Sequence, residues 1–233
     1  MGVPGMIMTW ADIRDKFPKC SRNRAYRLQK EHQLYSVRKK PFKICTTDSD
    51  HDLPVAENIL NREFDISEPG TVWVTDITQF NTLEGPIYLA TVKDLCDKQI
   101  VGWSAADNMR KELCLDALDN AVKRHRPAPG LIHHSDRGSQ YCSYAYQSSL
   151  ADNKMICSMS RKGNCWDNAC AETFFSAIKS ERLHHKVYKT IEEARQDIFW
   201  YIEYFYNRKR RHQALGNLTI PEFKRRMALK VAA

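Results

Sequence analysis

Residues 72–80, with the sequence VWVTDITQF, decide the fold expected for this chain. Val72, Val74, Asp76, Thr78 and Phe80 occupy alternate positions, so they share one face of a predicted β-strand. An ionised carboxylate on such an apolar face is costly to bury unless charge or hydrogen bonds compensate it. A metal ion would supply that compensation. An aspartate exposed at a strand end, or bonded to nearby backbone, is the simpler explanation for an isolated residue.

Strands and helices alternate around this segment. A turn at 84–86 separates it from two further strands, and period-two and period-3.6 patterns predict the elements that follow. They are strands at 87–92, 99–105, 131–134 and 155–159, and helices at 110–125, 144–153 and 167–183. Thr190 and Glu193 form a capping box that begins a last helix. The fold class is therefore α/β, with a mixed five-stranded sheet flanked by helices.

The chain divides into four segments by composition. Residues 1–50 form a basic N-terminal arm, in which a short helix at 21–34 has too few apolar anchors to fold alone. Residues 51–70 are interpreted as a linker with one short helix near 56–62. Residues 71–185 contain the sheet and its helices, and residues 186–233 form a helical, basic C-terminal extension.

Composition limits the classes of function. A chain of 233 residues with 42% hydrophobic content can bury a full core. Its net charge of +8 and pI near 9.0 favour a polyanionic partner such as DNA, RNA or an acidic membrane surface, although many basic proteins bind no nucleic acid. We find no spanning segment and no signal peptide, so a cytoplasmic protein is expected. The eight scattered cysteines predict reduced thiols rather than zinc sites.

Two more carboxylates stand in distinctive settings. Asp136 follows a predicted strand within residues 133–141, HHSDRGSQY, where ordinary turn chemistry also explains it. Glu172 lies in residues 167–175, DNACAETFF, on a predicted helix. That helix has a polar face of Asn168, Glu172, Ser176 and Lys179 and an apolar face of Ala171, Phe174 and Ile178. Glu172 is therefore expected to project from a helix that is anchored on the sheet. A polar face that is simply exposed to solvent would explain the same pattern.

Three acids at two strand ends and one helix favour a site for hard divalent cations. Carboxylate-only sites prefer Mg²⁺ or Mn²⁺ to zinc. Two such ions can activate an oxygen nucleophile and stabilise both the transition state and the leaving oxygen at a phosphodiester. Asp76, on the strand expected at the centre, would bridge two ions, with Asp136 and Glu172 each completing one shell. The chemistry indicated is cutting and joining of nucleic acid.

These three motifs and residues 206–216, YNRKRRHQALG, resemble the catalytic OrfB part of bacterial insertion-sequence transposases of family three, relatives of retroviral integrases. The resemblance covers residues 54–224. It implies a ribonuclease-H-like fold, a DDE triad at Asp76, Asp136 and Glu172, and Mg²⁺-dependent strand cleavage and transfer, with Mn²⁺ as a substitute. The attacking group would be a DNA 3′-hydroxyl.

Further DNA contacts are expected by the same analogy. Asn168 would orient Glu172 or touch DNA, unless it only caps its helix, and Lys179 would contact a terminal phosphate, unless it is simply solvated. The tract Arg208, Lys209, Arg210, Arg211 and His212, beside Tyr204 and Tyr206, is suited to phosphate contact.

The expected partners are the terminal repeats of the element, target DNA, further copies of this chain and an upstream OrfA-type DNA-binding protein or fusion. Relatives carry a helix-turn-helix region before the basic arm, and only its tail, 23–34, is expected here. Two alternatives stay open. One is a catalytically silent DNA-binding remnant. The other is a ribonuclease-H-type nuclease without joining activity, which predicts the triad but not the segment at 207–216.

Overall fold

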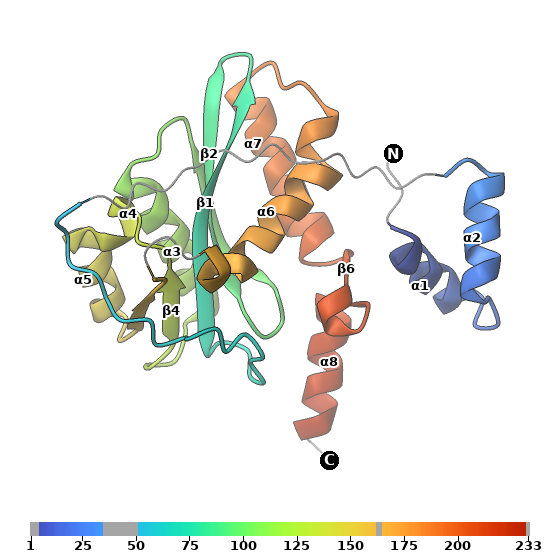
Figure 1. The fold of residues 1–233 in the computed structure, drawn as a ribbon, viewed down its shortest axis with the longest axis horizontal. Coiled ribbons are helices and arrows are strands. Elements are labelled where there is room, and N and C mark those ends of the chain that lie inside the picture. The colour runs from blue at the N-terminus through green and yellow to red at the C-terminus, as the bar shows by residue number, and fades with distance from the viewer. Residues whose placement is uncertain (1–4, 35–50, 162–164, 232–233) are drawn as a thin grey trace.

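A mixed sheet of five strands forms the centre of the protein. The computed structural model describes residues 5–34, 51–161 and 165–231. The strands are β1 (Val72–Thr82), β2 (Gly85–Asp94), β3 (Ile100–Ala106), β4 (Ile132–Ser135) and β5 (Ile156–Met159), in the order β3-β2-β1-β4-β5. β1, β2 and β3 pair antiparallel, whereas β4 pairs parallel to β1 and β5 parallel to β4 (Figure 1). The expected fold class is confirmed, and β1 is the central strand.

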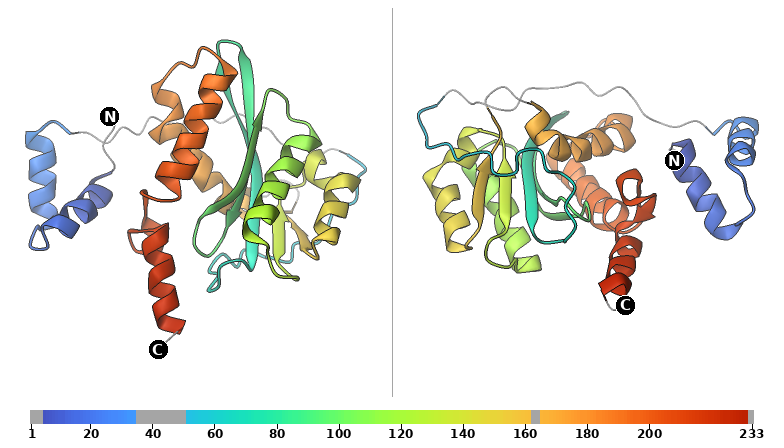
Figure 2. Two further views of the ribbon diagram at one scale, coloured as in Figure 1. Left: turned by 180° about the vertical axis from the view of Figure 1, so that it is seen from behind. Right: turned by 60° about the horizontal axis from the view of Figure 1, so that its bottom comes forward.

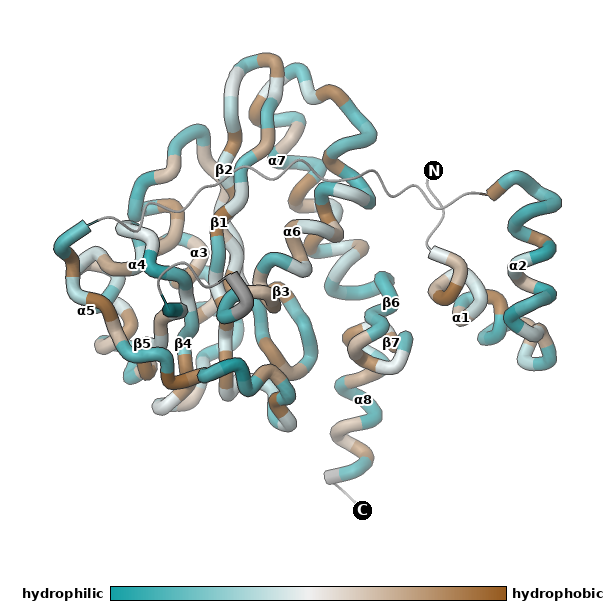
Figure 3. Tube along the Cα trace, in the orientation of Figure 1, coloured by the Kyte–Doolittle hydropathy of each residue, from teal (hydrophilic) through white to brown (hydrophobic). Residues whose placement is uncertain are grey.

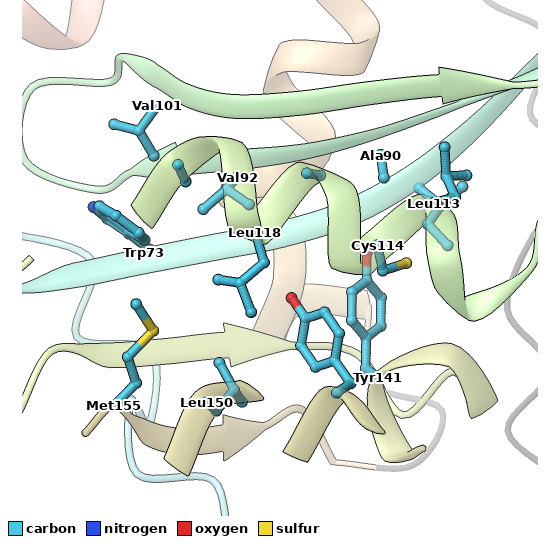
Figure 4. Packing of buried hydrophobic residues seen from close by; sticks show 14 of the residues in the cluster. Trp73, Ala90, Val92, Val101, Leu113, Cys114, Leu118, Tyr141, Leu150 and Met155 are labelled. Atoms are coloured by element: carbon cyan, nitrogen blue, oxygen red, sulfur yellow. The ribbon is translucent and has the colours of Figure 1, made fainter. Parts of the chain in front are cut away.

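Helices cover both faces of this sheet, as Figure 2 shows. On one face lie α3 (Lys111–His125), the short α4 (Ser139–Cys142) and α5 (Tyr144–Asp152). Trp73 and Ile77 of β1 point into this layer, where Trp73, Leu118 and Tyr141 belong to one buried cluster (Figure 4). Gly102 on β3 permits the close approach of α3, because a Cβ atom there would collide with the carbonyl oxygen of Ala117.

The opposite face carries α6 (Ala169–Glu181) and α7 (Ile191–Phe199). A 3-10 turn (Cys165–Asn168) leads into α6, another (Leu183–His185) follows it, and α7 continues as a π-helix (Trp200–Tyr206). Phe80 and Leu89 of the sheet are buried against Phe174 and Phe175 of α6. Phe175 belongs to the same buried cluster as residues of α7 and the π-helix.

A pair of helices precedes the sheet. The expected helix at 21–34 is present as α2 (Arg22–Glu31), capped by Ser21, whereas α1 (Met6–Lys16) was not predicted. Trp10 joins the two, since its indole nitrogen donates to the carbonyl oxygen of Cys20 and its ring lies 4.6 Å from the guanidinium groups of Arg14 and Arg22. Figure 3 shows α2 as largely hydrophilic. Packing against α1 explains how so polar a helix is held.

The prediction of a short helix near 56–62 is wrong. Residues 51–70 contain no helix, and Asn61 and Arg62 have positive φ angles of 42° and 65°, which a right-handed helix excludes. Instead, the backbone N–H groups of Ile59 and Leu60 donate to the hydroxyl of Ser158 on β5, at 3.0 and 3.1 Å. The segment is therefore bonded to the edge of the sheet.

The C-terminal extension is helical as expected, but with an interruption. After the π-helix, β6 (Arg211–His212), a 3-10 turn (Gln213–Leu215) and β7 (Leu218–Thr219) form a small hairpin, and α8 (Ile220–Val231) follows. Neither the hairpin nor the separate α8 was predicted. In the described ranges, no helix combines the length and apolar character that crossing a membrane requires.

Candidate active site

The register of two parallel strands brings Asp76 and Asp136 together. Val74 of β1 is paired with His134 of β4, and each aspartate lies two positions further along its chain. Neighbouring strands are about 4.8 Å apart, so the two residues reach the same level at the end of the parallel pair. Both side chains are partly buried. Two acids that are distant in the sequence thus lie at the same end of the parallel strand pair.

Electrostatics link both aspartates to Glu172. Burial raises the pKa of Asp76 well above its usual value, the negative charge of Asp136 raises it further, and Glu172 adds a smaller effect. The opposing influences on this pKa are the backbone N–H of Ile77, which donates to Oδ1 at 2.8 Å, and the cation of Lys179. A concentration of negative charge that raises a carboxyl pKa is what a bound cation would neutralise.

Asp136 is fixed by a turn directly after β4. Its Oδ1 accepts a hydrogen bond from the backbone N–H of Gly138 at 2.9 Å, while Arg137 donates to the carbonyl oxygen of Ser160 at 2.6 Å. A Cβ atom at position 138 would lie 3.1 Å from the same Oδ1, so a larger residue would crowd the carboxylate. The turn chemistry considered as an alternative is present, and it orients the acid.

Glu172 occupies the first turn of α6 and is partly buried. The predicted apolar face is confirmed: Ala171 packs with Val72 and Val74, and Phe174 and Ile178 join the larger cluster on the same side of the sheet. The helix is therefore anchored directly beside the strand that carries Asp76.

The donor set suits a hard divalent cation, because all three side chains offer carboxylate oxygens. Across residues 5–34, 51–161 and 165–231, no three His, Cys, Asp or Glu side chains stand close enough to hold a metal ion as placed. Asp76, Asp136 and Glu172 thus form a cluster of interacting charges without a closed coordination shell.

Lys179 and Asn168, both expected at the DNA, are buried. Burial lowers the pKa of Lys179 and the charge of Asp76 raises it, so this lysine is an internal cation beside the site and not a solvated one. Asn168 makes no side-chain capping bond, and its buried Oδ1 has no hydrogen-bond partner among the described residues. Asn168 thus stands at the N-cap position of α6 without capping the helix through its side chain, and its DNA contact stays a prediction.

Asp167, which the sequence did not single out, fixes the start of α6. Arg161 donates two side-chain hydrogen bonds to it, at 2.9 and 3.0 Å, Arg62 donates one at 2.7 Å, and Asn58 donates one at 3.0 Å. The bonds from Arg161 hold the pKa of Asp167 far below its usual value. No signal in the sequence distinguished it from the adjacent Asn168, because Arg62 and Asn58 come from a distant segment and no pattern relates Arg161 to it.

The basic tract does not present one continuous surface. Arg208 and Lys209 are exposed. Arg210 is buried and bonded to Glu181, Arg211 is bonded to Glu222 and to Asp12 and Asp15 of α1, and His212 is buried against Tyr206. The prediction that all five side chains contact DNA therefore needs correction, since Arg210 and His212 are internal. Asn207, in the same motif, exchanges two hydrogen bonds with the backbone of Ile100, at 3.0 and 2.9 Å.

Comparison with known proteins agrees with this architecture. Models described as integrase core domain match residues 66–165 and 153–219. The chain is 47% identical over 203 residues to the 31 kDa protein of insertion element IS600 from Shigella sonnei, covering 87% of this chain and 74% of that protein. This chain belongs to the IS3 family of insertion-sequence transposases.

Another family member, transposase InsF of insertion sequence IS3A from Escherichia coli K12, is 44% identical over 174 residues. The alignment covers 75% of this chain and 60% of InsF, so the chain spans about three fifths of that relative. Among solved structures, the HTLV-2 integrase catalytic core in complex with magnesium, in its dimeric form, superimposes with a TM-score of 0.51 at 14% identity, covering 66% of this chain and 96% of the core. The likeness shows a ribonuclease-H-like fold.

Proposed function

We propose that this IS3-family chain carries the catalytic centre of a DNA transposase, which cleaves strands at the ends of an insertion sequence and joins the freed 3′-hydroxyl to target DNA. The observation that carries the proposal is that Asp76 of β1 and Asp136, directly after the parallel strand β4, lie at the same level, with the charge of Glu172 acting on the same carboxyl. The family membership supports the reaction class.

Two Mg²⁺ ions, or Mn²⁺ in their place, are part of the proposal. Asp76 would bridge them, and Asp136 and Glu172 would each hold one. When bound, the ions supply activation of the attacking oxygen and neutralisation of charge at the phosphodiester. The protein contributes the orientation of its ligands, through the N–H of Ile77 on Asp76 and the N–H of Gly138 on Asp136. The HTLV-2 integrase catalytic core, which has a related fold, was solved in complex with magnesium, and this supports the choice of metal.

DNA would be held by two groups of cations. The first is formed by the exposed cations of α2, Arg22, Arg24, Arg27 and Lys30, as part of a helix pair derived from a helix-turn-helix region. The second is the exposed pair Arg208 and Lys209. Both suit phosphate contact, which positions a protein on DNA without reading its sequence. We further propose that the active form contains several copies of this chain, with an OrfA-type partner or fusion supplying specific recognition of the element's ends.

The decisive experiment compares the wild type with Glu172→Gln on labelled DNA carrying the element's ends, in Mn²⁺. Glutamine preserves volume and helix propensity, so folding and DNA binding should persist while products disappear. Cleaved and joined products from the wild type alone would support the proposal. Cleavage without joining would identify a nuclease, and DNA binding without products would identify a silent remnant.

A further inference from the structure

Lys93, on β2, is a buried cation that the proposed reaction does not use. Only 4% of the residue is exposed, and none of the described residues forms an ion pair with it. Its ammonium nitrogen donates to the carbonyl oxygen of Cys170 and to the hydroxyl of Thr173, both at 2.8 Å. The hydroxyl of Thr173 donates in turn to the same carbonyl oxygen, at 2.7 Å. One strand side chain thus bonds twice to the first turn of α6.

This connection joins the two parts of the candidate site. Lys93 is paired with Val74 across the β1 and β2 ladder, two residues before Asp76. Its two acceptors, Cys170 and Thr173, lie on α6, and Glu172 stands between them in the sequence. No other described hydrogen bond ties the side chain of a β2 residue to α6. The side chain therefore spans from the strand beside Asp76 to the helical turn that presents Glu172.

Keeping an amine at this position is costly. The pKa of Lys93 falls to about 7, mainly because of burial, with smaller contributions from the cations of Lys98 and Arg210 and an opposing effect from Cys170. Apolar residues of similar volume in place of buried charges are often neutral or stabilising. Stability alone does not require a lysine here, and the two hydrogen bonds to α6 indicate a different use for the side chain.

We propose that Lys93 is a positioning residue, which holds the first turn of α6 against β2 and thereby sets the place of the Glu172 carboxylate relative to Asp76. The inference rests on the metal site proposed above. It concerns placement and not charge, because Lys93 acts through its hydrogen bonds to the carbonyl oxygen of Cys170 and the hydroxyl of Thr173, on either side of Glu172 in the sequence.

The test is Mn²⁺ binding to the full chain by isothermal titration calorimetry, without DNA, together with the thermal midpoint of each variant. Lys93→Met should weaken Mn²⁺ binding by roughly 10-fold, the lower end of the effect of residues that orient metal ligands, with the midpoint unchanged or raised. If Lys93 acted only through its positive charge, its removal would tighten Mn²⁺ binding instead. The direction of the change in Mn²⁺ affinity therefore separates a positioning role from a charge effect. Lys98→Met is the matched control, since the hydrogen bond of Lys98 that the described residues show stays within its own turn, to the carbonyl oxygen of Leu95.

A second pair of variants keeps the test informative if Lys93→Met fails to fold. Thr173→Val keeps the side-chain shape but removes the acceptor and should weaken Mn²⁺ binding, whereas Thr173→Ser should restore it. Mn²⁺ affinity equal to that of the wild type in both Lys93→Met and Thr173→Val would overturn the role of Lys93, provided that Glu172→Gln loses affinity. If Glu172→Gln binds Mn²⁺ as the wild type does, the metal site itself is disproved, and the inference on Lys93 is overturned with it.

Discussion

Arg210 donates two hydrogen bonds, at 2.7 and 2.9 Å, to the carboxylate of Glu181, the last residue of α6. The hydroxyl of Tyr201 donates to the same carboxylate at 2.7 Å. The C-terminal motif therefore fastens one end of the helix whose other end carries Glu172. A tract that resembles a DNA-binding surface in sequence contains a structural ion pair at its centre.

Breaking this pair should destabilise the fold. We expect Arg210→Met to lower the free energy of unfolding by about 3 kcal/mol, because removal of one partner leaves the Glu181 charge poorly compensated. Arg208→Met, at an exposed position, should change it by less than about 0.5 kcal/mol. Urea denaturation measures both. Equal stability of the two variants would show that the pair contributes nothing, and a double replacement by Met at 210 and Leu at 181 should recover most of the loss.

Arg208 and Lys209 should account for the DNA contact of the tract. Replacing both by Gln should weaken binding to any DNA sequence and reduce the slope of log K against log salt by about 2, since each phosphate contact contributes close to 1. Lys209 packs over the ring of Tyr204 at 3.9 Å, which holds it at the surface. Fluorescence anisotropy at several salt concentrations gives the slope. A slope that stays constant in this variant would remove the tract from the DNA interface.

The strands and helices of the core could be predicted from the sequence because each has a clear period and a marked end. The alternation of apolar residues predicted β1, and the apolar face of α6 predicted which way Glu172 projects. Local patterns failed where a distant partner decides the conformation. Residues 56–62 resemble a helix in sequence, but they form bends and a turn that are bonded to Ser158. The pattern of α1 is too weak to stand out before its contacts with α2 are known.

Within the candidate site, the three acids were predictable as residue types in distinctive settings, but their relation was not. Only the parallel register of β1 with β4 shows that Asp76 and Asp136 reach the same level. Burial was equally hidden, because Arg210 and Arg208 look alike in a run of basic residues. The bonds of Asp167 to Arg62 and Arg161 join segments that no periodicity relates.

Asp167 gives the fold a defined pH dependence. Its bonds with Arg161 depress the pKa of the folded state, so the stability that it contributes is present above its unfolded pKa of about 4 and is lost as the pH falls towards the depressed folded value. We therefore expect Asp167→Asn to be less stable than the wild type at pH 7, with a smaller gap at pH 3. Urea midpoints at both pH values test this. The control is Asp152→Asn, at an exposed position on α5, and a gap that does not change with pH would contradict the prediction.

Metal should stabilise the folded chain through Asp76. Without a cation, burial and the charges of Asp136 and Glu172 penalise the ionised form of this carboxyl, as the raised pKa shows. Asp76→Asn removes that penalty, so the metal-free variant should melt above the metal-free wild type. Mg²⁺ at 100 times its dissociation constant should then stabilise the wild type by about 2.7 kcal/mol and leave Asp76→Asn unchanged. Differential scanning calorimetry with Mg²⁺ and with EDTA measures both effects, and Asp116→Asn, an exposed position on α3, should respond as the wild type does. An identical response of all three proteins to Mg²⁺ would place any bound metal elsewhere.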